Sequence, residues 1–288
     1  MEAGVSVLGV PVGGPLLARW RGWLAPDAQP FVVEEPSAFG FQKDHGSEVS
    51  PELRDTFKLW AISKDDPLTW LSEEEFTSLD RSSRAGLVRR QVRAGRGQVP
   101  AVRAWADLID ASVLRAQSDG HRFVWWPSLI TDEILTPVLT RVVERQRLPS
   151  RHEEVPEATW RSCEEVVPGA RSLGGTFAGG SGPNCFSTVM AASGQSEAGD
   201  AWVMQDQFQG WLGETTRQGG ADQDPGTVLV WMDSSDLAQH AAVTLGDGWA
   251  LEKASQEWHS PRAVTAVGDV IRTARYPGNH LRRFTLNR

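Results

Sequence analysis

The sequence contains little cysteine, tyrosine and lysine, and it has no long hydrophobic run. Its 288 residues include 2 Cys and 1 Tyr, and lysine occurs only at positions 43, 58, 64 and 253. Two cysteines are too few for a disulfide framework, which leaves a free thiol available for chemistry. No stretch approaches the roughly 18 consecutive apolar residues of a membrane span, so we expect no membrane partner.

The chain has no excess of positive charge, because 37 Asp and Glu residues outnumber 29 Lys and Arg residues and the formal net charge is -8. A nucleic-acid partner would need a basic surface that displaces counterions, so we expect none. The opening segment, MEAGVSVLGVPVGG, has no basic residue ahead of its apolar stretch, and Gly and Pro interrupt that stretch. A secretory signal has the opposite pattern, so the sequence predicts a cytoplasmic protein.

Motifs for metals and nucleotides are missing as well. Neither His-x-x-x-His nor Cys-x-x-Cys occurs, so no metal site is expected. The glycine-rich segment GGTFAGGSG, residues 174–182, lacks the Gly-Lys-Ser/Thr ending that grips phosphates. We therefore expect no cofactor and interpret this segment as a flexible approach to the cysteine that follows it.

The N-terminal half, residues 1–150, is predicted to be mainly helical. Residues 1–50 are rich in Gly and Pro and predict an irregular arm. Ser72 and Glu75 form a capping-box pattern, and the apolar positions through Val92 mark one face of a helix. Further helices are expected at residues 51–60, 100–113 and 131–148, with a buried strand or connector at residues 121–126. The Pro-containing segment 149–157 is the predicted linker.

Residues 151–288 predict a second domain of the α+β class. Helices are expected around Trp160, from Cys185 and over residues 204–216. Strands are expected at residues 227–232, 239–245, 249–254 and 281–286, and Gly246-Asp247-Gly248 forms a tight turn between two of them. Helices followed by an antiparallel meander are typical of α+β proteins. The 13 Trp residues serve either as core bulk or as a flat binding wall.

Cys185 is the candidate nucleophile. The preceding Gly182-Pro183-Asn184 breaks the chain, so the cysteine falls in the first turn of a helix. Unpaired amides and the helix dipole favour an anion there, and the thiolate is the nucleophilic form. Cys163 lies inside a helix between Ser162 and Glu164, which is typical of a structural cysteine.

His240 and Glu252 complete the candidate catalytic set. His240 opens a central strand and can face the start of a helix packed on the sheet, as a Cys–His pair requires. The turn at residues 246–248 brings Glu252, twelve positions further on, beside it. A carboxylate there would orient the imidazole, although Gln256 is an alternative. Glu257 and His259 belong to a predicted solvated surface loop, with a place in the substrate groove as the alternative.

These residues resemble a known family over about residues 170–288. The order of Cys185 at a helix start, the strand PGTVLVW and the hairpin QHAAVTLGDGWALEKAS is similar to the NlpC-type branch of the papain-like cysteine hydrolases. The resemblance implies a helix packed on an antiparallel sheet, with Cys185 as nucleophile, His240 as base and Glu252 as third residue. Around the nucleophile this chain has Asn-Cys-Phe-Ser, where the family usually has Asp-Cys-Ser-Gly.

The resemblance implies a hydrolase of amide or peptide bonds that works through a thioacyl enzyme. Its substrate would be a small molecule or a peptide. One alternative is an acyltransferase of specialised metabolism that uses the same Cys–His site and an acyl carrier as partner. Another is a papain-like binding protein that has lost activity.

Overall fold

The computed structural model describes residues 5–33, 49–63, 67–145 and 147–287, and it combines helices with antiparallel sheet. The chain divides into two compact units. One contains Ala3–Val12 and Val143–Arg288, and the other contains Gly13–Val142. The predicted linker belongs to the first unit, because Ser150 N donates to Leu8 O (2.7 Å) and Arg151 N donates to Val264 O (2.7 Å). Among the described residues, no helix has the length and apolar character needed to cross a bilayer.

Helices dominate the unit Gly13–Val142. Its α-helices are α1 (Gly14–Leu24), α2 (Pro51–Thr56), α3 (Glu73–Ser78), α4 (Arg81–Arg93), α5 (Ala111–Ala116) and α6 (Asp132–Glu144), the last running into the other unit. Short 3-10 turns lie at Leu59–Ala61, Val102–Ala104 and Pro127–Leu129. Strands β3 (Ala28–Val32) and β4 (Leu68–Ser72) pair antiparallel.

Several predictions for this half need correction. The prediction of an irregular arm is wrong for residues 5–33, which form the β1–β2 hairpin, α1 and β3. Residues 34–48 of the predicted arm lie outside the described part of the chain. The capping box of Ser72 and Glu75 is confirmed. The helix expected to run on through Val92 is two helices, because Asp80 accepts hydrogen bonds from Ser82 N and Ser83 N and starts α4. Residues 123–126 are a fully buried connector.

The other unit is built on a seven-stranded sheet, with the order β5-β10-β9-β8-β7-β11-β6, and each neighbouring pair is antiparallel. The strands are β5 (Thr176–Phe177), β6 (Thr216–Gln218), β7 (Pro225–Met232), β8 (Ala238–Gly246), β9 (Trp249–Lys253), β10 (Pro261–Ala266) and β11 (His280–Leu286). The four predicted strands are confirmed as β7, β8, β9 and β11. A separate hairpin joins β1 (Val5–Val7) to β2 (Val10–Val12).

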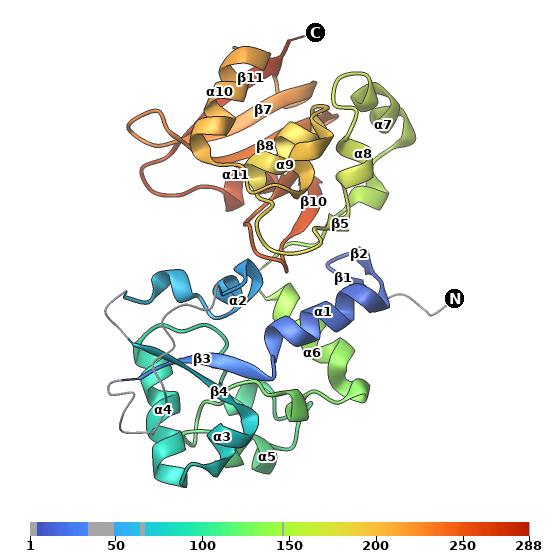
Figure 1. Cartoon of the computed structure of the whole chain (residues 1–288). Coiled ribbons are helices and arrows are strands. Elements are labelled where there is room, and N and C mark those ends of the chain that lie inside the picture. Colours follow the sequence, from blue (N-terminus) through green and yellow to red (C-terminus); the bar gives the residue numbers. More distant parts are fainter. Residues whose placement is uncertain (1–4, 34–48, 64–66, 146, 288) are drawn as a thin grey trace. The chain divides into compact units, whose positions relative to one another are not determined.

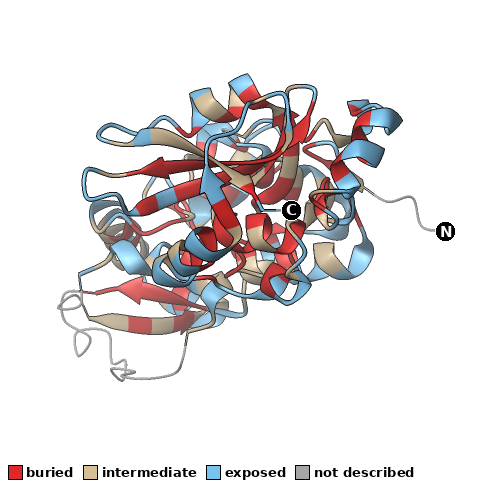
Figure 2. Cartoon of the chain, turned by 90° about the horizontal axis from the view of Figure 1, so that it is seen from above, coloured by how far each residue is buried: buried red, intermediate tan, exposed pale blue. Residues whose placement is uncertain are grey.

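Helices cover both faces of this sheet. One face packs against α7 (Glu157–Glu164), α9 (Cys185–Ala192) and α10 (Gln205–Thr215), with α8 (Ala170–Leu173) beside α9, and alternate strand residues such as Val228, Ala241 and Leu251 fill the layer between. On the other face, α11 (Val267–Thr273) packs against Trp231, Ala242 and Ala250. Figure 1 shows α9 and α10 lying over the sheet, and Figure 2 shows its central strands buried. This layering holds the start of α9 against the middle of the sheet.

Candidate active site

Cys185 is the first residue of α9, and a local hydrogen-bond pattern fixes it there. Asn184 is the N-cap, and its Oδ1 accepts from Ser187 N (3.0 Å) while Ser187 Oγ accepts from Asn184 N (2.8 Å). Gly182 has a φ angle of 116°, a backbone conformation that residues other than glycine rarely adopt. The turn therefore sets the helix start, and Cys185 is buried with 8% of its surface exposed.

His240 lies near the start of β8, where the strand pairs with Trp231 of β7. An irregularity in the pairing between Trp231 and Met232 shifts the register at this point. A β-bulge re-aims side chains and is common beside active sites. The imidazole packs on the Trp231 indole with ring centroids 5.2 Å apart, and His240 is 7% exposed.

Glu252 lies on β9, which follows β8 through the predicted tight turn. Gly246, Asp247 and Gly248 all have positive φ, so the turn is confirmed. Glu252 pairs with Ala242 in the strand register, and its Oε2 is 2.9 Å from Nε2 of His240. Glu252 therefore holds the imidazole. The backbone carbonyl of Gln256, the residue named as the alternative, accepts a hydrogen bond from Gly182 N (2.9 Å).

The structure brings Cys185, His240 and Glu252 together. His240 is hydrogen-bonded to Glu252, and Cys185 lies close enough to raise the pKa of the imidazole through charge and hydrogen bonding. Because Nε2 faces Glu252, Nδ1 is the ring nitrogen available to the thiol. Burial lowers the pKa of His240, but the negative charges and hydrogen bonds of Cys185 and Glu252 together outweigh burial and raise it to about 10. The geometry therefore favours the charged imidazolium form of His240.

Lys253 is a fourth member of this region that the sequence analysis missed. Its side chain is fully buried, and Nζ donates hydrogen bonds to the backbone carbonyls of Ser255 and Glu257, the latter at 2.9 Å. Lysine is almost never fully buried unless paired, so its position requires a reason. The signal was its place next to Glu252 in an otherwise apolar strand, in a chain with few lysines.

The charge of Lys253 is coupled to its surroundings. Burial, followed by the charges of Arg262 and Arg147, lowers its pKa to about 7, while Glu257 and Cys185 oppose this shift. Lys253 is thus close enough to Cys185 for the two charges to interact. A cation in this position stabilises a thiolate.

The segment after Lys253 is anchored to the approach to Cys185. Trp258 N donates to Ser181 Oγ (3.1 Å), next to the bond between Gly182 N and Gln256 O. Trp258 is fully buried, so the predicted solvated loop is wrong here. Its indole is part of the core beneath the loop, whereas a solvated loop would leave it exposed. The loop therefore braces the turn that carries the nucleophile.

Glu257 and His259 are also held within this segment. Glu257 forms an ion pair with Arg147 (2.8 Å), and His259 Nε2 lies 3.4 Å from Glu257 Oε2. Their side chains are mostly buried. Both therefore stabilise the loop that supports Lys253 and Gly182.

Cys163 has the structural role that its sequence context predicts. It is fully buried in α7 within the core between helices and sheet. Burial, followed by the charge of Glu164, raises the pKa of its thiol to about 12. It therefore stays protonated and unreactive near neutral pH.

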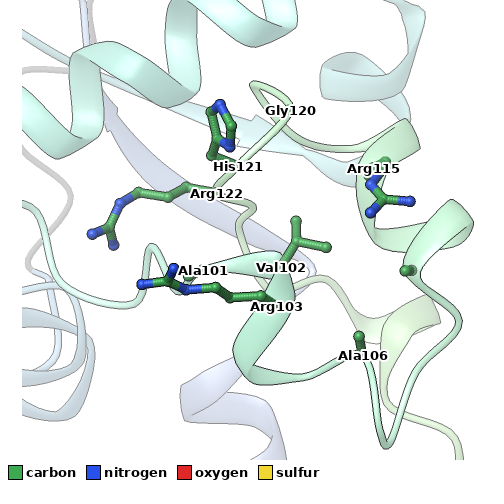
Figure 3. A pocket seen from close by; sticks show the side chains of 9 residues that line it. Ala101, Val102, Arg103, Ala106, Arg115, Gly120, His121 and Arg122 are labelled. Carbon is green, nitrogen blue, oxygen red and sulfur yellow. The ribbon is translucent and has the colours of Figure 1, made fainter.

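A pocket of about 500 Å³ lies in the unit Gly13–Val142, and its lining differs from the Cys–His–Glu site in being basic. Its described lining includes Arg103, Arg115, His121 and Arg122 and no carboxylate. Figure 3 shows Arg103 and Arg122 on one side of Val102 and Arg115 on the other. The lining suits an anion and offers no nucleophile. Among the described residues, no group of three or more His, Cys, Asp or Glu side chains is arranged to hold a metal ion.

The chain matches no protein-family model, and no curated protein or solved structure is significantly similar to it.

Proposed function

We propose that the unit containing residues 143–288 is a papain-like cysteine hydrolase of the NlpC type that cleaves an amide or peptide bond. The observation that carries this proposal is the contact of one imidazole with both Cys185 and Glu252. A helix that starts at the cysteine and packs on an antiparallel sheet that carries the histidine supports the papain-like assignment. We expect a small-molecule or peptide substrate and no cofactor.

The first half-reaction forms a thioacyl enzyme. Sγ of Cys185 attacks the substrate carbonyl carbon, and the carbonyl π electrons move to oxygen. The backbone N–H of Cys185, in the first turn where amides lack intrahelical partners, stabilises this oxyanion. The imidazolium of His240 then gives its proton to the leaving nitrogen as the C–N bond breaks.

The second half-reaction releases the acyl group. Neutral His240 takes a proton from water, and the water oxygen attacks the thioester carbon. The C–S bond breaks and returns the electron pair to sulfur as thiolate. Throughout, Glu252 keeps the ring oriented and stabilises its positive charge. If an amine replaced water, the same site would transfer the acyl group, so amine-dependent turnover with little hydrolysis would favour an acyltransferase that receives its acyl group from a carrier.

Alkylation by iodoacetamide at pH 6 tests the activated thiol. We expect Cys185 to react at least tenfold faster than a small free thiol and His240→Ala to remove this advantage. Cys163 is the internal reference, because mass spectrometry should find it unmodified until the protein is unfolded. A Cys185 that reacts no faster than the small thiol, with no effect of His240→Ala, would refute the proposal and favour an inactive binding protein.

A further inference from the structure

Three exposed apolar side chains lie on segments that are tied to the neighbours of Cys185 and His240. Trp202 is 49%, Met204 54% and Leu237 40% exposed, although large hydrophobic residues are normally buried. Trp202 and Met204 flank buried Val203 in an extended segment, so both project away from the core on the same side. Singly exposed residues need no explanation, but neighbouring ones mark binding surfaces.

One end of this group is tied to the nucleophile. Asn184, the N-cap directly before Cys185, donates from Nδ2 to Val203 O (2.8 Å). A Cβ placed on Gly182 would lie 3.7 Å from Trp202 Cβ, so the backbone at Trp202 packs against the turn before Cys185. The segment with Trp202 and Met204 is therefore in direct contact with the start of α9.

The other end is tied to the strand of the base. Gln205, next to Met204, donates from Nε2 to Ala238 O (2.7 Å), and Gln209 donates to Asp236 O (3.3 Å). Leu237 lies between these two acceptors, three residues before His240. The apolar group thus extends from the approach to the nucleophile to the approach to the base.

The small area of these three side chains and the charges beside them indicate which kind of group can bind there. Three side chains cover far less than the roughly 800 Å² per partner of a stable protein interface. They are enough to cover a short hydrocarbon or aromatic group. Asp200 and Asp206 are exposed on either side of Trp202 and Met204, which disfavours an anionic group.

We propose that Trp202, Met204 and Leu237 form the subsite for an uncharged apolar acyl group whose carbonyl Cys185 attacks. This proposal rests on the proposed function and names its substrate class. Apolar contact with the acyl group would hold the carbonyl over Sγ, and the polar leaving group would extend into solvent. The reaction remains the acyl transfer described above, so no further reactant is needed.

Two uncharged alkylating agents test the subsite on the full chain. Iodoacetamide and N-hexyl iodoacetamide form the same Sγ–CH₂ bond and release the same iodide, but only the second carries a hydrocarbon. The measured quantity is the ratio of their rate constants, N-hexyl over unsubstituted, divided by the same ratio for a small free thiol. We expect this normalised ratio to be at least about fivefold in the wild type, because burying the CH₂ groups of the hexyl chain stabilises the bound reagent.

Substitutions locate the effect. Trp202→Ala and Met204→Ser should each lower the normalised ratio at least threefold. Trp60→Ala is the matched control, because Trp60 is 61% exposed and lies in the unit Gly13–Val142. It should leave the ratio unchanged. Circular dichroism checks that each variant is folded.

The outcomes separate this proposal from the proposed function. Slow iodoacetamide reaction that is insensitive to His240→Ala refutes the activated thiol. Fast, His240-dependent iodoacetamide reaction with a normalised ratio near one, or with a ratio that neither Trp202→Ala nor Met204→Ser lowers, refutes the apolar subsite and leaves the thiol chemistry intact.

Discussion

Nε2 of His240 and Oε2 of Glu252 lie 2.9 Å apart on neighbouring strands that are joined by the two-residue turn of Asp247 and Gly248. This contact fixes one ring nitrogen and leaves Nδ1 as the nitrogen that can serve Cys185. Because the imidazole is buried, water cannot replace Glu252 as the partner of its Nε2. The carboxylate therefore determines both the orientation and the charge of the proposed base.

Glu252→Gln should slow alkylation of Cys185 without unfolding the protein. The amide retains a hydrogen bond to His240 but removes the negative charge that stabilises the imidazolium. We expect a three- to tenfold lower rate constant with iodoacetamide at pH 7. Glu197→Gln, which removes an exposed carboxylate from the same unit, is the control and should react like the wild type. Equal rates for all three proteins would contradict the role of Glu252.

His240 should titrate far above the ordinary range of histidine, and its partners should contribute in a defined order. In the wild type the pKa is about 10, with Cys185 contributing more than Glu252 to raising it against burial. Cys185→Ser removes the partner that contributes most to raising the pKa of His240 and leaves the burial, so this pKa should fall by more than it does in Glu252→Gln. NMR titration of the imidazole measures both shifts. A larger effect of Glu252→Gln would show that the coupling to Cys185 is weak.

Lys253 should make the protein less stable as the pH falls towards neutrality. Its pKa is lowered to about 7 in the folded state from an ordinary value of 10.5, mainly by burial. Between these values the unfolded chain binds the proton more tightly, so the contribution of Lys253 to the free energy of unfolding rises with pH. The slope is at most about 1.4 kcal/mol per pH unit.

Lys253→Met removes this pH dependence and also the hydrogen bonds to the loop carbonyls. Urea unfolding at several pH values from 7 to 10 should show the wild type gaining stability relative to the variant as pH rises. The variant should also alkylate more slowly at Cys185, and Lys253→Arg should recover part of that rate. A stability difference that is constant with pH would mean that Lys253 is equally protonated in the folded and unfolded states.

Asn184→Ala should weaken both the helix start and the reactivity of Cys185. The loss of the cap should lower the free energy of unfolding by about 1 kcal/mol, and the bond to Val203 is lost as well. Ser72→Ala removes the corresponding capping box of α3 in the unit Gly13–Val142. It should cost a similar amount while leaving the alkylation rate of Cys185 unchanged. Thermal unfolding measures the loss of stability, and iodoacetamide kinetics measure the reactivity of Cys185. Equal alkylation rates in the two variants would show that the helix cap does not affect the reactivity of the thiol.

The elements that carry the site could be predicted from the sequence because their signals are local. Gly182-Pro183-Asn184 ends one segment and caps the next, so Cys185 had to begin a helix. Alternating apolar residues and the glycine-flanked turn at residues 246–248 defined β8 and β9. The turn also set the register, which brings Glu252 close to His240.

Other features had no local signal. Strand β10 and helix α11 follow a polar segment, and their burial depends on partners far away in the sequence, such as β5 for β10. Trp258 was assigned to a solvated loop because its neighbours are polar, but its indole is fully buried. For Lys253 the apolar strand gave only part of the signal, because its hydrogen-bond acceptors are backbone carbonyls that no pattern of side chains reveals.

The sequence alone determined the α+β character of the C-terminal region, the helix start at Cys185 and the hairpin that joins His240 to Glu252, because each depends on residues within a few positions of one another. Only the tertiary structure decided that Cys185 meets His240, that a buried lysine lies within electrostatic range of the thiol, and that Trp202 and Met204 flank the nucleophile. Those contacts join segments distant in the chain, and they form when apolar burial packs α9 and α10 against the sheet.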